Sequence, residues 1–206
     1  MRKFIKKTIK ATIISLIVAL LIMFALVIIV KYFFRAEIDY AITLANMVSV
    51  NTEPEIVQET VLNEKNEIEN YPSYGTQYAT IEIPKIDKTL PVFFGDSLEI
   101  LKKGVGHFAG SYFPSEGGSI VYMGHNSKDT FRRLGEVQIG DEIIVTASYG
   151  KYTYKVYDMA VIQETEEDKL PIQKDKEILM VYTCYPFANI GHAYRRYVVY
   201  AELAAQ

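Results

Sequence analysis

Cys184, the only cysteine of the chain, ends the apolar stretch EILMVYTC (177–184). A thiol with its ordinary pKa of about 8.5 is mostly protonated at neutral pH, so it acts as a nucleophile only beside a base or a positive charge. His125 ends the predicted strand SIVYMGH (119–125) and could be that base, because two strand ends on one rim of a barrel can be neighbours. These residue types predict cysteine nucleophilic catalysis with a histidine as general acid and base. The alternative is a buried, inert cysteine that packs as a small hydrophobe.

Two adjacent arginines, Arg195 and Arg196, begin the next predicted strand, RRYVVYAEL (195–203), about a dozen residues after Cys184. A thiolate that attacks an amide creates an oxyanion, which a fixed cation stabilises. Antiparallel pairing of the two strands would put one arginine beside the thiol. Because side chains alternate along a strand, only one of the two can face it. Two surface arginines at a strand end are the alternative interpretation.

The other two histidines, His107 in GVGHFAG and His192 in IGHAY, lie in glycine-flanked stretches and are expected to be exposed loop residues. Of the two, His192 could line a substrate groove. We expect no metal or other cofactor, because the sequence has no metal-binding spacing of His or Cys and no glycine-rich phosphate loop. The acidic run QETEEDKL (163–170) is interpreted as a solvated loop, with a calcium site as the alternative.

The N-terminal region is predicted to anchor the protein in a membrane. Residues 11–30 are uncharged and match the roughly 20 apolar residues that a helix needs to span a bilayer. Five basic residues precede them and two follow closely, which predicts a cytoplasmic N-terminus and an exported remainder. The run is longer than the roughly 7–15 residues of a cleaved signal, so we expect a retained signal anchor. The remainder of the chain is acidic, which argues against a nucleic-acid partner.

The chain is predicted to have four parts: a basic tail (1–10), a transmembrane anchor (11–30), a stalk (31–70) and a catalytic domain (71–206). The domain contains about seven or eight strand-like stretches with short turns between them, which favours a mainly β fold and a small closed barrel. One short helix is expected at DSLEILKKG (96–104), with Asp96 as its N-cap and Gly104 at its end.

Three stretches of this domain together resemble the sortases, the membrane-anchored cysteine transpeptidases of Gram-positive bacteria. They are MVYTC (180–184), YMGHN (122–126) and RRYVVYAEL (195–203), within a resemblance that runs from about Tyr78 to Glu202. TCYPF (183–187) and the residues that follow His125 are most similar to class D. The resemblance implies a sortase-like β-barrel.

It also implies a role for each candidate. Cys184 would be the nucleophile, His125 the general acid and base, and Thr183 would help to shape the oxyanion pocket. The family's arginine directly precedes an aromatic and aliphatic run, which selects Arg196; a register slip of one residue would select Arg195.

The implied substrate is a protein with an LPxTG-like sorting signal, cut between Thr and Gly and then joined to an amine of a cell-wall precursor. Leu170, Pro171 and Ile172, in the loop 163–177, would seat the leucine and proline of that signal. Two alternatives stay open. The protein could be a membrane-tethered cysteine hydrolase that uses water as acceptor, or a non-catalytic β-barrel that binds a partner.

Overall fold

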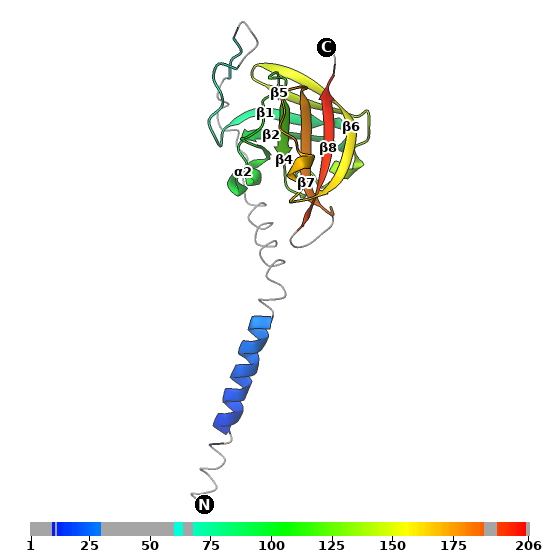
Figure 1. Ribbon diagram of the computed structural model, residues 1–206. Coiled ribbons are helices and arrows are strands. Elements are labelled where there is room, and N and C mark those ends of the chain that lie inside the picture. Colours follow the sequence, from blue (N-terminus) through cyan, green and yellow to red (C-terminus); the bar gives the residue numbers. More distant parts are fainter. Residues whose placement is uncertain (1–9, 11, 30–59, 64–67, 188–192, 205–206) are drawn as a thin grey trace, which may run out of the picture. The chain divides into compact units, whose positions relative to one another are not determined.

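The computed structural model describes residues 10, 12–29, 60–63, 68–187 and 193–204 of the chain. They belong to two units: the N-terminal helix and the domain that contains the strands (Figure 1). Residues 1–9 of the predicted basic tail (1–10), most of the predicted stalk and His192 lie outside the described residues.

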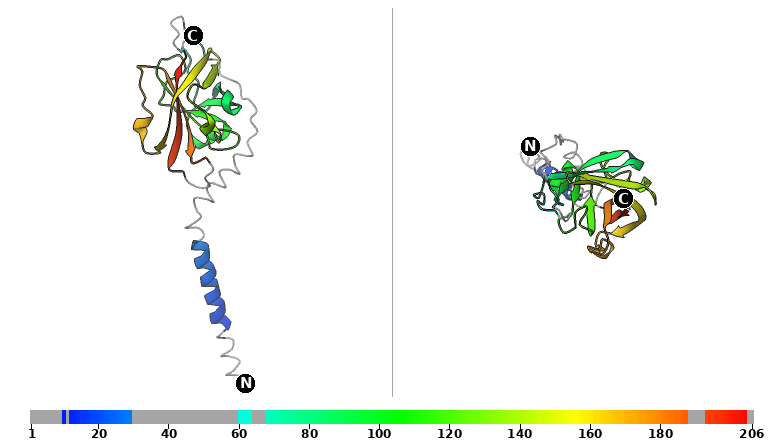
Figure 2. Two further views of the ribbon diagram at one scale, coloured as in Figure 1. Left: turned by 90° about the vertical axis from the view of Figure 1, so that its right-hand side faces the viewer. Right: turned by 90° about the horizontal axis from the view of Figure 1, so that it is seen from above.

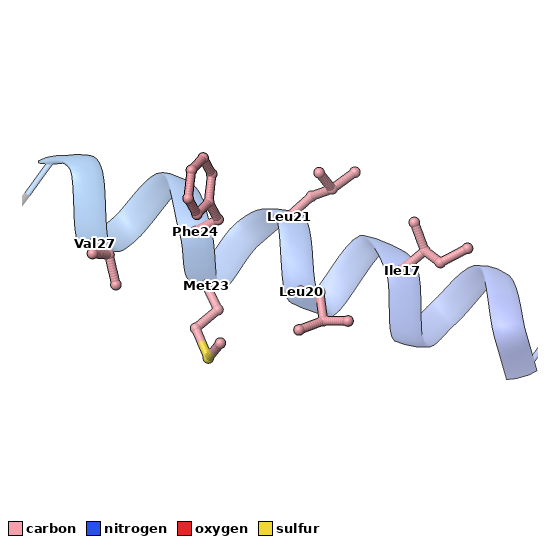
Figure 3. Close-up of a pocket in the computed structure, with 6 residues that line it drawn as sticks. All are labelled: Ile17, Leu20, Leu21, Met23, Phe24 and Val27. Carbon is pink, nitrogen blue, oxygen red and sulfur yellow. The ribbon is translucent and has the colours of Figure 1, made fainter.

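The N-terminal unit contains an apolar helix, Thr12–Ile29, which is long and apolar enough to cross a membrane. At 1.5 Å per residue, its 18 residues extend about 27 Å, close to the roughly 30 Å hydrocarbon core of a bilayer. Its side chains, such as Ile17, Leu21 and Phe24, project away from the helix axis (Figure 3) and are not buried by protein. An apolar surface all around a helix suits contact with lipid.

The second unit is a β-barrel that closes in the strand order β1-β2-β3-β4-β7-β8-β6-β5. The pairs β2–β3 and β4–β7 are parallel, and the other neighbours are antiparallel. Figure 1 shows β7 (orange) next to β8 (red), and Figure 2 shows the barrel from two further directions. The prediction of a mainly β, closed barrel is therefore confirmed. The strands are β1 Gln77–Ile83, β2 Lys88–Phe94, β3 Val105–His107, β4 Ser119–Met123, β5 Glu142–Ala147, β6 Gly150–Gln163, β7 Ile178–Tyr185 and β8 Arg195–Leu203.

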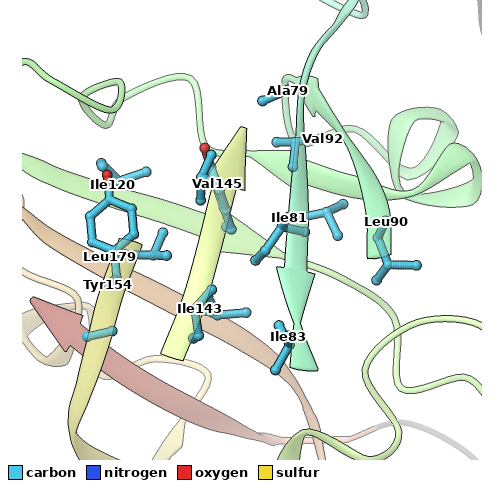
Figure 4. Close-up of a cluster of buried hydrophobic side chains, with 14 of the residues drawn as sticks. Ala79, Ile81, Ile83, Leu90, Val92, Ile120, Ile143, Val145, Tyr154 and Leu179 are labelled. Atoms are coloured by element: carbon cyan, nitrogen blue, oxygen red, sulfur yellow. The ribbon is translucent and has the colours of Figure 1, made fainter. Parts of the chain in front are cut away.

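Alternation along the strands separates the barrel interior from a second, outer apolar cluster. Labelled side chains from β1, β2, β4, β5, β6 and β7 point toward one another inside the barrel (Figure 4). The outer cluster consists of four buried residues from four neighbouring strands, with Leu170 of the β6–β7 loop packed against them. These four residues are Val121, Ile162, Met180 and Val198. Both faces of β4 are thereby buried, which explains its uninterrupted apolar sequence.

The short helices are η1 Pro84–Ile86, α2 Leu98–Lys103, η2 Leu134–Glu136 and η3 Glu167–Lys169. The expected helix at 96–104 is α2, but its N-cap is Ser97 rather than Asp96. The Ser97 side chain accepts a hydrogen bond from the Ile100 N–H at 3.4 Å. Asp96 accepts instead from the Tyr74 hydroxyl at 3.0 Å. Gly104 ends the helix as predicted.

Part of the predicted stalk packs against the barrel. Ile68 is buried in the main core cluster, and Leu62 packs against that cluster. The backbone N–H of Thr60 donates to Ser148 Oγ at 3.1 Å, and this hydroxyl donates back to the Thr60 carbonyl at 3.0 Å. The described residues between 60 and 70 therefore contribute to the packed unit, although their weakly periodic, acidic sequence predicted a solvated connection.

Candidate active site

The strand order β4-β7-β8 brings three of the predicted site residues to one part of the barrel wall, with Cys184 on the middle strand. Cys184 is half-buried and lies directly opposite Arg196 in the antiparallel pair β7–β8. Residues directly opposite each other in such a pair have side chains on the same face, about 5 Å apart at Cβ. The Arg196 side chain therefore extends from the same face as the thiol.

The register separates the two arginines. Arg195 lies opposite Tyr185, and its guanidinium is 5.2 Å from the centre of the Tyr185 ring. Because neighbouring residues of a strand point to opposite faces, Arg195 does not share the face of Cys184. The geometry thus favours Arg196 as the arginine that acts beside Cys184, as the resemblance implied.

His125 follows β4 and reaches the same level of the wall as Cys184. Met123 pairs with Tyr182 in the parallel ladder, and the Gly124 N–H continues it by donating to the Tyr182 carbonyl at 3.2 Å. His125 comes two residues after Met123, and Cys184 comes two residues after Tyr182. The register therefore brings the backbones of His125 and Cys184 alongside each other. The strand itself ends at Met123, two residues before the predicted end.

The backbone around His125 is held by the turn that follows it. Its carbonyl accepts hydrogen bonds from the Phe131 N–H at 3.1 Å and from the Thr130 hydroxyl. Among the described residues, the buried Nε2 of the imidazole has no hydrogen-bond partner. This nitrogen therefore has a hydrogen-bonding position that the described residues do not use.

Thr183 is fully buried and points to the barrel face opposite that of Cys184. Its hydroxyl donates to the carbonyl of Gly124 at 2.8 Å. The side chain thereby fixes the residue that precedes His125. The predicted part of Thr183 in an oxyanion pocket stays a prediction, and the position of its hydroxyl favours an indirect contribution.

Two further residues hold the site together, and the sequence interpretation missed both. Asn126 is 7% exposed, and its side-chain amide donates to the Pro186 carbonyl at 3.0 Å, which ties the segment of His125 to the segment of Cys184. Glu164, the first residue after β6, accepts from Arg196 Nη2 at 3.0 Å. The position of Asn126 next to His125 was a signal for the first. Nothing in the local sequence signals the second, because the pairing depends on the β6–β8 register.

The predicted groove residues lie along the β6–β7 loop, which covers the outer cluster. Leu170 is partly buried against that cluster, Pro171 is exposed, and Ile172 is 44% exposed. Tyr182, which shares the face of Cys184, also packs against the outer cluster. The loop and the thiol therefore belong to the same outer side of the wall.

Burial shifts the pKa values of Cys184 and His125 in opposite directions. It raises the pKa of the Cys184 thiol; the positive charge of Arg196 lowers that pKa, and the negative charge of Glu164 raises it. Burial, with a smaller contribution from Lys102, lowers the pKa of His125. Both changes favour a neutral thiol beside a neutral imidazole, so the thiolate–imidazolium pair is a minor form at neutral pH.

The expectation for His107 was wrong, because this residue is not in an exposed loop. It ends β3 and is fully buried. Its Nδ1 is 2.9 Å from the Tyr78 hydroxyl, and its Nε2 is 2.9 Å from Ser111 Oγ. Burial lowers its pKa to about 3, so His107 is a neutral part of the core. The flanking glycines suggested a loop, but Gly106 lies within the strand, where a side chain would meet the Gly95 carbonyl at 2.7 Å.

The described residues contain no group of three or more His, Cys, Asp and Glu side chains arranged to hold a metal ion. The calcium site considered for the acidic run 163–170 therefore has no support from the described side chains.

The barrel thus brings a cysteine of β7 between the segment of a histidine that follows β4 and an arginine of β8, which suits cysteine nucleophilic catalysis. The family model described as "Sortase domain" matches residues 81–204. The chain belongs to the sortase family, and it is a cysteine transpeptidase of that family.

Known relatives agree with this assignment. The chain is 40% identical over 139 residues to Sortase D of Bacillus subtilis (strain 168), which covers 67% of this chain and 69% of the relative. The structure of a Clostridium perfringens sortase D5 transpeptidase matches with a TM-score of 0.59 and 27% identity, over 65% of this chain and 82% of that one. The structure of sortase C from Clostridium perfringens SM101 matches with a TM-score of 0.57 and 25% identity, over 81% and 90%.

Proposed function

We propose that Cys184 is the nucleophile of this sortase, His125 its general acid and base, and Arg196 the cation that stabilises the oxyanion. The observation that carries this assignment is the register of β4, β7 and β8. It aligns His125 with Cys184 on one side and pairs Cys184 with Arg196 on the other.

We propose an LPxTG-like sorting signal as the substrate. The Cys184 thiolate attacks the carbonyl carbon of the threonine, and the tetrahedral intermediate carries its negative charge on the former carbonyl oxygen. Arg196 stabilises this oxyanion. The C–N bond to glycine then breaks, and His125 donates its proton to the departing amine. A thioester between the threonine and Cys184 remains.

An amine of a cell-wall precursor completes the reaction. Its nitrogen attacks the thioester, His125 accepts the proton that the amine loses, and the Cys184 thiolate leaves. The product is a new amide bond, and the enzyme is regenerated. One histidine alternately donates and accepts a proton in this scheme. Burial lowers the pKa of His125, so its neutral form, which accepts the proton, prevails at neutral pH.

We propose that the β6–β7 loop binds the apolar part of the signal. Leu170, Pro171 and Ile172 offer apolar surface on the side of the wall that carries Cys184. Substitution of Ile172 by Ser should raise KM more than it lowers kcat, because this contact is the same in the ground state and the transition state.

We propose that the apolar helix is a retained anchor, with the N-terminus in the cytoplasm and the barrel outside the cell. The excess of basic residues before the helix supports this orientation. The proposed reaction also requires the barrel to lie outside the cell, because sorting signals and cell-wall amines meet at the outer face of the membrane.

The test uses the full chain in detergent micelles, incubated with LPxTG-type peptides, with and without glycine or diaminopimelate as the amine. Intact mass should show a thioacyl adduct on Cys184 that the amine converts into a new peptide. An adduct that only water resolves would favour the cysteine hydrolase. The C184A variant is the control, and identical behaviour of this variant and the wild type across a peptide panel would refute the assignment.

A further inference from the structure

Glu164 forms a contact with Arg196 that the reaction as proposed above does not use. The carboxylate Oε2 lies 3.0 Å from Arg196 Nη2, and the two side chains are 31% and 22% exposed. Ile162, two residues earlier on β6, pairs with Arg196 across the β6–β8 ladder. The Glu164 N–H also donates to the Tyr194 carbonyl at 2.9 Å, so the backbone of Glu164 is attached to the segment that leads into β8.

The guanidinium of Arg196 is held at both terminal nitrogens. Nη1 donates to the Ala193 carbonyl at 2.6 Å and to the Arg195 carbonyl at 3.1 Å, while Nη2 donates to Glu164. The two carbonyls belong to the chain just before and at the start of β8, whereas the carboxylate comes from the end of β6. Glu164 is thus the one side chain among these acceptors, and the only charged one.

We propose that Glu164 is a positioning residue for transpeptidation, which holds Arg196 beside Cys184 and offsets part of its positive charge. This inference rests on the proposed role of Arg196. It assigns a function to one residue of the acidic run 163–170, which the sequence alone suggested was a solvated loop.

The charged and titratable groups around the thiol come from four elements. Arg196 belongs to β8, Glu164 follows β6, His125 follows β4, and Tyr182 lies on β7 itself. Lys102 of α2 acts on His125. Arg196 lowers the pKa of Cys184 while Glu164 raises it. The carboxylate therefore has two separable effects: it orients the arginine, and it reduces the fraction of thiolate that the arginine would otherwise stabilise.

Two substitutions separate these effects. In E164Q, the amide oxygen still accepts from Arg196 Nη2, but the negative charge is gone. In E164A, both the acceptor and the charge are lost. Glu202 provides a matched control, because it forms an ion pair with Lys176 at the opposite end of β8. The E202Q variant therefore removes a carboxylate from the same strand pair without touching Arg196.

The measurement is the pH dependence of iodoacetamide alkylation of the full chain in detergent, together with kcat and KM for the signal peptide. We expect the alkylation midpoint of E164Q to fall by roughly half a pH unit, less than the 1–3 units that an adjacent charge produces. Alkylation at neutral pH should then be about threefold faster, with turnover retained. In E164A, the midpoint should also fall, but kcat should drop by roughly tenfold, less than the 10²–10³ that loss of an oxyanion donor costs.

An E164Q midpoint equal to or above that of the wild type would overturn the proposal, whatever the turnover. So would a loss of kcat in both variants without any change in midpoint, which is the result of a merely structural role. If E164A does not fold, E164Q decides. The R196A variant separates the two roles, and its alkylation midpoint should rise. An unchanged midpoint in E164Q together with a raised midpoint in R196A would overturn only the role of Glu164. An R196A variant that changes neither the alkylation midpoint nor kcat would overturn the proposed role of Arg196 as well.

Discussion

The adjacent arginines offer a direct test of the site, because the structure assigns them opposite environments. Arg196 is paired with Cys184 across β7–β8, and Arg195 is paired with Tyr185. Replacement of each by alanine removes the same charge from the same strand end. Only one of the two substitutions should impair the chemical step.

The expected magnitudes differ by two orders. R196A removes the proposed donor for the oxyanion, and loss of such a donor costs about 10²–10³ in kcat, or roughly 3–4 kcal/mol of transition-state stabilisation. R195A removes a cation–π contact with the Tyr185 ring at 5.2 Å, worth about 0.5–1 kcal/mol at an exposed site. We therefore expect R195A to lose less than about fivefold in activity. This loss should come from a lower stability of the protein and not from a lower kcat.

The assay is steady-state kinetics of the full chain with a signal peptide and an amine acceptor, with thermal unfolding of each variant measured in parallel. Equal losses in kcat for the two variants would refute the register argument. A larger loss in R195A would show that β8 is shifted by one residue, since such a shift exchanges the faces of all its side chains.

Three further predictions follow from the same structure. Burial lowers the pKa of His125 and raises that of Cys184. The pH profile of kcat/KM should therefore rise through a midpoint below the usual pKa of histidine, stay level, and fall through a midpoint above the usual pKa of cysteine. Two midpoints close together near neutral pH would contradict this prediction. I68A should destabilise the barrel by about 2–4 kcal/mol in urea unfolding, whereas V61A, at a 47% exposed position, should change stability by less than about 0.5 kcal/mol; equal effects would argue against the packing of this segment. N126A should lower kcat by roughly tenfold with little change in KM, because it frees the His125 segment from Pro186 and small misplacements of catalytic groups are costly; an unchanged kcat would show that this tie is dispensable.

Much of the chemistry could be predicted from the sequence alone. Continuous apolar stretches marked the strands that end near His125 and Cys184, and 20 uncharged residues marked the N-terminal apolar helix. These signals are local: they depend on residue type and on a period of two or on the length of an apolar run. Local signals also suffice for α2, apart from the identity of its N-cap, where Asp96 and Ser97 are chemically equivalent candidates.

Only the tertiary structure decided the features that depend on which segments meet. The glycines around His107 suggest a loop, yet β2 and β4 enclose this residue as part of a strand. Arg196, rather than Arg195, lies opposite Cys184 because of a register that a shift of one residue would reverse. Ile68 is buried, and Glu164 reaches Arg196, because distant parts of the chain come together. A sequence states which residues are available, but pairing between strands determines which of them share a face.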